Sequence, residues 1–111
     1  MRRIDSQIDI RAESFQQNRE HNLGLVAGLR ERQRHARFER PERDRQRLAR
    51  QNKLFVRDRI ELLLDPGTPF LELSTLAANQ AYDGEVPSAG IVSGIGVVGG
   101  REVIIHADDG S

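Results

Sequence analysis

Residues 89–111 read AGIVSGIGVVGGREVIIHADDGS and carry the clearest structural pattern in the chain. Two runs rich in valine and isoleucine flank the pair Gly99-Gly100. A two-residue glycine connection favours a tight β-hairpin, because such a turn needs positive φ. The second run leads into a polar turn from Ala107 to Ser111, and we expect the chain to stop inside a longer motif.

The glycine turn also predicts the register of the hairpin. The expected pairs are Val98 with Arg101, Gly96 with Val103, Gly94 with Ile105, and Ser93 with His106. The face with Gly94 and Gly96 should form a shallow groove for close packing. The other face carries Ile91, Ile95, Val97 and Ile104. Both faces are apolar and need a cover, and we expect the helices of this chain to supply only one.

The first 64 residues are predicted to be mainly helical. Residues 1–12 show no clear period, and a helical pattern begins at Ser14. Pro41 should break this helix at Arg40 and allow a new one from about Glu42. From Arg43 to Leu64 the large apolar residues recur on one helical face, which predicts a single amphipathic helix. These residues are Leu48, Phe55, Val56, Ile60, Leu63 and Leu64.

Residues 65–69, DPGTP, should end that helix. Residues 70–73 then predict a short strand, with Phe70 and the two leucines as its buried side chains. Residues 76–81 are compatible with a short helix, and residues 82–88 with a loop into the hairpin. The fold class is therefore α+β, with a helical arm over residues 1–41 and a second part over residues 42–111.

Charge is unevenly distributed, although the formal net charge of the 111 residues is +0. Residues 30–50 are rich in arginine, which in one interpretation is a comb for nucleic-acid phosphates. The alternative is a solvated helix face with interspersed acidic residues. We favour the solvated face, because the segment holds one aromatic residue, Phe38, and no platform for base stacking.

Several kinds of site and compartment find no support in the composition. The chain has no cysteine, and His21, His35 and His106 do not have metal-ligand spacing. The N-terminus lacks the apolar region of a secretory signal, and no apolar run reaches membrane-spanning length. The cytosol is the expected compartment.

Two longer motifs resemble a known family. Residues 53–74 read KLFVRDRIELLLDPGTPFLELS, and the later motif combines Glu85-Val86-Pro87 with residues 89–96, AGIVSGIG, and Gly100-Arg101. Over about residues 45–111 the chain resembles the start of the carboxyltransferase (β) subunit of biotin-dependent acyl-CoA carboxylases. It looks most like the methylcrotonoyl-CoA or geranyl-CoA branch.

This resemblance implies a parent fold of the α/β crotonase-like type, a spiral of ββα units several times longer than this chain. Such enzymes move a carboxyl group from carboxybiotin to an acyl-CoA such as 3-methylcrotonoyl-CoA, and backbone amides stabilise the oxyanions. The glycine-rich segments that do this come later in the family's sequence. We therefore expect no catalytic residue and no metal ligand in this chain, and expect the fragment alone to be inactive.

The resemblance also implies partners and a compartment. Biotin would be carried by a partner subunit, the biotin carboxylase or biotin carrier (α) subunit, and other β subunits would form a homo-oligomer. Neither a membrane nor nucleic acid is expected as a partner. The compartment would be the cytoplasm, or the mitochondrial matrix in a eukaryote. The alternative function is a stand-alone arginine-rich helical module that binds nucleic acid or a partner protein.

The implied CoA-binding candidates fall into two groups. The turn after the hairpin would lie at the edge of the CoA site through its main chain, and comprises Ala107, Asp108, Asp109, Gly110 and Ser111. Asp108 stands where the family usually has Asn, and its charge disfavours a nearby phosphate. Arg57 and Arg59 are weaker candidates for pairing with phosphate. The alternative for both arginines is ion pairing with Asp58, Glu61 or neighbouring elements.

Overall fold

The computed structural model describes residues 1–84 and 86–111, which divide into two compact units, residues 1–32 and 33–111. The first unit contains most of helix α1 (Glu13–Phe38). The second contains the end of α1 and every later element: α2 (Glu42–Arg50), α3 (Val56–Leu63), β1 (Leu71–Leu73), η1 (Ala81–Gly84), η2 (Pro87–Gly90), β2 (Ile91–Val98) and β3 (Arg101–Asp108). The α+β class is thus confirmed, while the division at residues 41 and 42 stays a prediction.

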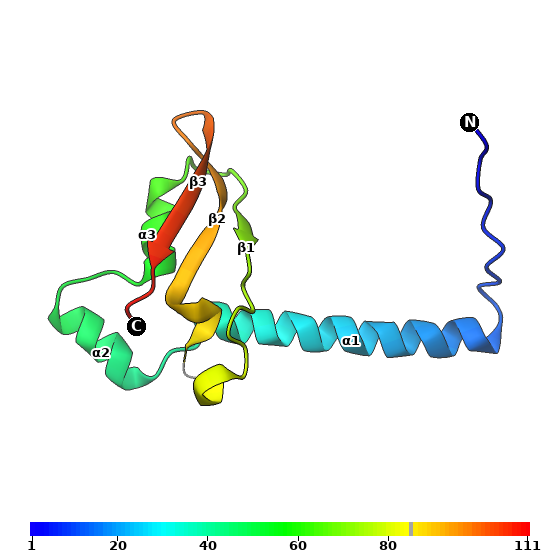
Figure 1. Ribbon diagram of the computed structural model, residues 1–111, viewed down its shortest axis with the longest axis horizontal. Coiled ribbons are helices and arrows are strands. Elements are labelled where there is room, and N and C mark those ends of the chain that lie inside the picture. The colour runs from blue at the N-terminus through cyan, green and yellow to red at the C-terminus, as the bar shows by residue number, and fades with distance from the viewer. Residues whose placement is uncertain (85) are drawn as a thin grey trace. The chain divides into compact units, whose positions relative to one another are not determined.

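The predicted hairpin is present with its predicted register. Strands β1, β2 and β3 form an antiparallel sheet in that order (Figure 1). All four predicted pairs occur, from Val98 opposite Arg101 to Ser93 opposite His106. Gly99 and Gly100 have φ of 60° and 74°, the left-handed values that the turn requires. The second unit is therefore built around this hairpin.

The two glycines of β2 create the expected groove on the inner face. A Cβ atom on Gly94 would lie 2.5 Å from the carbonyl oxygen of Leu71 and 2.5 Å from the Phe70 ring. A Cβ on Gly96 would overlap the side chain of Leu64. Helix α3 lies against β2 and β3, and its Val56 and Ile60 join Val92 and Ile105 in the buried core. Because Gly94 and Gly96 have no side chains, Phe70 and Leu64 can pack closely against β2.

The outer face of the sheet is open, and it corrects one prediction. The register aligns Leu71, Ile95 and Ile104 on this face, where Leu71 is 61% exposed and Ile104 83% exposed. Leu71 and Leu73 are therefore not buried, whereas Phe70 is half-buried. Side chains alternate along a strand, so the residue of β1 that faces inward is Glu72. Within residues 33–111, helix α3 covers the inner face of the sheet.

The single helix predicted over residues 43–64 is wrong, because it is two helices. Helix α2 ends at Arg50, and Asn52 adopts a left-handed φ of 54°. The amide of Asn52 donates to the carbonyl of Ala49 at 3.0 Å, and that of Lys53 to the carbonyl of Leu48 at 2.9 Å. This pattern is a Schellman motif, and Asn is one of the few residues besides glycine that tolerate its left-handed position. The break lets α3 start in a new direction.

Of the other predicted element boundaries, some are confirmed and some are wrong. The break at Pro41 and the end of the helix before residues 65–69 are confirmed. The short helix suggested for residues 76–81 is wrong, since residues 75–80 form successive turns held by bonds such as Ala77 N to Ser74 O, 2.9 Å. Residues 82–84 and 87–88 lie in short 3-10 segments, Val86 precedes the second one, and Glu85 of the predicted loop lies outside the described residues.

The first unit is an exposed helix with a thin apolar stripe. Leu23, Leu25, Val26 and Leu29 are each at least 40% exposed. A stripe this thin cannot bury enough area to hold a helix by itself. Across the part of the chain that the structure describes, no helix has the length and apolar character to cross a bilayer.

Candidate functional site

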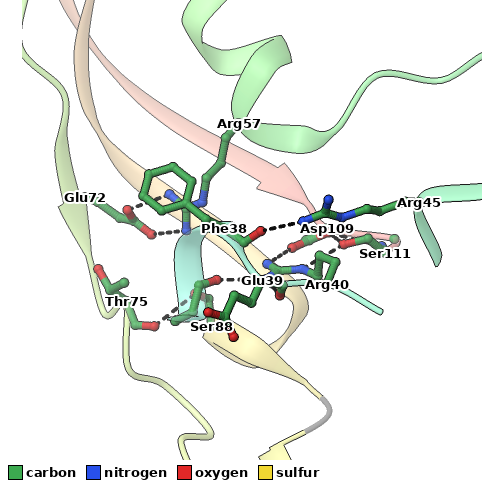
Figure 2. Close-up of polar contacts among 12 residues, drawn as sticks. Phe38, Glu39, Arg40, Arg45, Arg57, Glu72, Thr75, Ser88, Asp109 and Ser111 are labelled. Carbon is green, nitrogen blue, oxygen red and sulfur yellow. Dashed lines mark hydrogen bonds and ion pairs between the residues drawn. The ribbon is translucent and has the colours of Figure 1, made fainter. Parts of the chain in front are cut away.

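Arg40 is the centre of a buried polar cluster at the end of the hairpin. It follows α1 and reaches the residues after β3, which are about seventy positions away in sequence (Figure 2). Its Nη2 donates to Asp109 Oδ2 at 2.5 Å and its Nε to Ser111 Oγ at 2.9 Å. Both side chains of the Arg40–Asp109 pair are only 3% exposed. This pair therefore has the geometry of a charge-assisted bond shielded from water.

The rest of the Arg40 guanidinium is also occupied. Nη1 donates to the carbonyl oxygens of Ala36 at 3.0 Å and Glu39 at 2.6 Å. The guanidinium carbon lies 5.2 Å from the centre of the Phe55 ring, within range of a cation–π contact. Arg40 thus joins the end of α1, the start of α3 and the end of β3.

The turn after β3 is closed by its own side chains and by a second arginine. Asp109 Oδ1 accepts from the Ser111 amide at 3.1 Å and from the Ser111 hydroxyl. Arg47 of α2 donates from Nη2 to the carbonyl of Gly110. The Asp109 amide donates to the carbonyl of Gly90 at 2.8 Å. Residues 109–111 therefore have a defined conformation.

These contacts change the acidity of Asp109. Burial alone would raise the pKa of this carboxyl group, but hydrogen bonds from Arg40 and Ser111 and the charge of Arg40 outweigh it. The pKa of Asp109 is therefore lowered from its ordinary value of 3.8. Its carboxylate is ionised at neutral pH, and its charge is balanced by Arg40.

A second buried ion pair joins α3 to β1. Arg57 binds Glu72 at two points, with Nη1 to Oε2 at 2.7 Å and Nη2 to Oε1 at 2.8 Å (Figure 2). Arg37 adds a third bond, from Nε to Oε2 at 3.1 Å. Burial would raise the pKa of Glu72, yet the bonds and charges of the two arginines lower it below its ordinary value of 4.5. Among the described atoms, Arg57 Nε is buried without a hydrogen-bond partner.

A carboxylate also holds the hairpin turn. Asp65 Oδ1 accepts from the Gly99 amide and Oδ2 from the Gly100 amide, each at 2.7 Å. The Asp65 amide donates to the carbonyl of Val97 at 2.8 Å. Two successive amides that point to one anion form a small anion-binding nest. Asp65 thus joins the end of α3 to the turn.

A pocket of about 360 Å³ opens beside the turn after β3. Phe38, Leu54 and Phe55 supply apolar walls, while Arg45 and Lys53 supply positive charge and Asp58 supplies a negative charge. Ser111 and Arg40 line the same pocket. One side of the 109–111 segment therefore faces a space with both apolar and basic character.

The predicted site residues separate into two groups in the structure. Ala107 packs against the core, Asp108 is exposed at the end of β3, and Asp109, Gly110 and Ser111 form the turn described above. Arg57 is occupied by Glu72, a residue of a neighbouring element, whereas Arg59 is exposed on α3. The two arginines therefore do not converge on the turn.

Sequence reasoning missed Arg40, Arg47 and Glu72. The arginines were hidden in a segment where arginine is common, and their contacts with residues 109–111 depend on tertiary structure. Glu72 could have been found, because a strand that alternates Phe70, Leu71, Glu72, Leu73 next to a glycine groove must put one charged residue on the same face as Phe70. Within the described residues, no cluster of histidine, aspartate and glutamate has the arrangement to hold a metal ion.

Comparison with known proteins shows the family of the chain. Residues 47–111 match the carboxyl transferase domain. The chain belongs to this family. It is 53% identical over 68 residues to the biotin-dependent 3-methylcrotonyl-coenzyme A carboxylase beta1 subunit of Mycobacterium tuberculosis, a match that covers 61% of this chain and 13% of that protein.

Two further relatives of this carboxyl transferase chain match over nearly its whole length. The mitochondrial methylcrotonoyl-CoA carboxylase beta chain of Arabidopsis thaliana is 38% identical over 92% of the chain and 17% of that protein. The crystal structure of the geranyl-CoA carboxylase beta subunit of P. aeruginosa superposes with a TM-score of 0.75 at 36% identity, over 96% of this chain and 20% of that one. The chain thus spans 13% to 20% of the length of these three relatives.

Proposed function

We propose that this chain is the N-terminal part of the carboxyltransferase (β) subunit of a biotin-dependent acyl-CoA carboxylase. The whole subunit would transfer a carboxyl group from carboxybiotin to an acyl-CoA such as 3-methylcrotonoyl-CoA. The observation that carries the proposal is the match of residues 47–111 to the carboxyl transferase domain. It is supported by the hairpin, whose apolar outer face is open.

The role we propose for residues 107–111 is to border the acyl-CoA site through main-chain groups. Two observations support this role: the defined conformation of the turn, and the pocket beside Ser111 with its apolar and charged lining. Exposed Arg59 stays a proposed phosphate contact. For Arg57 the ion pair with Glu72 favours the structural alternative, because a guanidinium bound at two points to a carboxylate has little capacity left for phosphate.

Biotin would reach the enzyme on a partner (α) subunit, and further β subunits would complete a homo-oligomer. We assign no residue of this chain to biotin. The polar side chains of the turn are already bonded to one another, and the buried donor at Arg57 Nε lies in a different cluster. The biotin-binding and catalytic groups would therefore come from other parts of the subunit.

The arginine-rich segment offers little for the alternative function in nucleic-acid binding. Arg37, Arg40 and Arg47 bind carboxylate or carbonyl oxygens of this chain. Arginines engaged in this way cannot pair freely with phosphates. For the compartment we propose the cytoplasm, or the mitochondrial matrix in a eukaryote; the Arabidopsis relative is named as mitochondrial.

A chimera tests the proposed function. Residues 1–111 replace the segment that they match in the geranyl-CoA carboxylase β subunit of P. aeruginosa, which is then assembled with its own α subunit. We expect carboxylation that depends on the acyl-CoA, and none from the same enzyme without the segment. A chimera that assembles but has no activity would contradict the proposal.

The isolated 111 residues give a second test. We expect them to have no carboxyltransferase activity, because the segments that stabilise the oxyanions are supplied by the rest of the subunit. The assay is decarboxylation of a carboxylated acyl-CoA in the presence of free biotin. Turnover by the purified chain would show that the catalytic groups lie within these residues.

A further inference from the structure

Two arginines hold three successive residues at the end of the hairpin. Arg40 binds the side chains of Asp109 and Ser111, and Arg47 binds the carbonyl of Gly110. Arg40 also binds two carbonyls at the end of α1. Apart from the bond between the Asp109 amide and the Gly90 carbonyl, the contacts given above for residues 109–111 are made by side chains, so this segment depends on them for its conformation.

We propose that Arg40 is a positioning residue that sets the conformation of residues 109–111 at the border of the acyl-CoA site. This inference rests on the proposed function of that turn. Arg40 would not touch CoA itself. Its effect would pass through Asp109 and Ser111.

The geometry of the guanidinium supports positioning over ligand contact. Four of the five N–H donors of Arg40 are used by acceptors within this chain. Its side chain is 3% exposed, and Phe55 lies against the guanidinium. An incoming phosphate would have to displace these acceptors before it could bind. The planar, forked shape of the group is suited to holding several acceptors at fixed angles.

Charge supports the same role. An unpaired carboxylate at Asp109 would repel the phosphates of CoA. With Arg40 in contact, the Asp109–Arg40 pair has no net charge, and the turn can border an anionic ligand without this cost. Lysine at position 40 would keep the charge but could not bridge Asp109 and Ser111 in the same way.

The experiment uses the chimeric geranyl-CoA carboxylase with Arg40→Gln, Arg40→Lys and Ser111→Ala. We expect KM for the acyl-CoA to rise about tenfold in Arg40→Gln while kcat changes little, because a contact that binds the ground state and the transition state equally affects KM and not kcat. Arg40→Lys should recover part of the loss. Ser111→Ala removes the hydroxyl that accepts from Arg40 and donates to Asp109 but leaves the Arg40–Asp109 pair, so it should cause a smaller rise in KM, and the inference remains testable if Arg40→Gln does not assemble.

Two matched variants separate positioning from a loss of stability. Ile60→Ala lowers stability in the α3 core at a side chain that makes no hydrogen bond to residues 109–111, and Arg50→Gln removes an exposed arginine of α2 whose Nε donates to the Gln46 carbonyl of its own helix. Neither should change KM. Amide hydrogen exchange of the peptide covering residues 109–111 should accelerate in Arg40→Gln and not in Arg50→Gln.

Each outcome decides a different point. An unchanged KM and unchanged exchange in the Arg40 variants, within an active chimera, would overturn the positioning role and leave the proposed function intact. A rise in KM of the same size in Ile60→Ala would also overturn it, since instability alone would then explain the effect. An unsubstituted chimera that assembles without activity would overturn the proposed function and with it this role.

Discussion

Arg57 and Glu72 form a two-point ion pair that ties helix α3 to strand β1. Their side chains are 14% and 4% exposed, so neither charge is well solvated. Replacing Glu72 by Gln leaves the Arg57 charge buried, and we expect the free energy of unfolding to fall by about 2–4 kcal/mol. The measurement is the urea midpoint of the 111-residue chain by far-UV circular dichroism. Glu61→Gln, an exposed carboxylate of α3, is the control, and an equal loss there would contradict the prediction.

Acid should destabilise the second unit through two carboxylates. The pKa values of Glu72 and Asp109 are lowered from 4.5 and 3.8 in the folded chain. A group with a lowered folded pKa stabilises the fold above its unfolded pKa and loses this contribution as pH falls through the folded value. Stability should thus be constant in this respect above about pH 5 and decline below pH 4.5.

The variant Asp109→Asn tests the origin of this acid sensitivity. It removes one titrating group, so the decline of the urea midpoint below pH 4 should become shallower than in the unsubstituted chain. Its midpoint at pH 7 should be lower, because the Arg40 charge loses its partner. An unaltered pH profile would mean that Asp109 is not protonated in this range.

The hairpin could be predicted from sequence because its pattern is local. Gly99-Gly100 between two apolar runs is sufficient for turn and register, and both are observed. The Schellman break at Asn52 was not predicted, since apolar positions on both sides keep a common helical face when read as one helix. Its local sign was the polar run Gln51-Asn52-Lys53, in which Asn can take the left-handed position.

The candidate site was less accessible to sequence reasoning. The polar turn predicted from Ala107 begins two residues later, because Ala107 and Asp108 still belong to β3. Resemblance could locate this segment, but the arginines that hold residues 109–111 are Arg40 and Arg47, far away in the chain. Periodicity does not distinguish these arginines from their solvated neighbours. Strand alternation places Glu72 on the same face as Phe70, but its position opposite Gly94 depends on the tertiary pairing of β1 with β2.

The glycine groove of β2 should be intolerant of side chains. Gly94→Ala places a Cβ 2.5 Å from backbone oxygen and from the Phe70 ring, so β1 must move. We expect the free energy of unfolding to fall by about 3 kcal/mol, the upper end of the range for overpacked protein interiors. Urea titration measures it. Gly24→Ala serves as control: beyond its chain neighbours and the nearby backbone of its own helix, no described atom lies within 4 Å of the added Cβ, and Ala should favour the helix by about 1 kcal/mol. A midpoint unchanged by Gly94→Ala would show that β1 does not pack closely there.

The contact between Asp65 and the hairpin turn should contribute to stability. Asp65→Ala removes the acceptor of two amides, and we expect the free energy of unfolding to fall by about 1–2 kcal/mol. The loss should be no larger, because the freed amides can bind water. Asp65→Asn keeps one acceptor oxygen, so its stability should lie between that of Asp65→Ala and that of the unsubstituted chain. The urea midpoints of the two variants give the order. Equal losses would show that both bonds depend on charge and not on geometry.

The open outer face of the sheet should make the isolated chain only marginally stable and able to bind apolar dyes. Ile104 is 83% exposed there, whereas its neighbour Ile105 is 7% exposed on the inner face. Ile104→Thr keeps a β-branched side chain, so dye fluorescence should fall while the free energy of unfolding changes by less than about 0.5 kcal/mol. Ile105→Ala should instead lose about 2–5 kcal/mol, as expected for a buried aliphatic side chain. A sharp, cooperative melt of the unsubstituted monomer without dye binding would contradict the exposed face, because a contiguous apolar surface in water should bind such a dye.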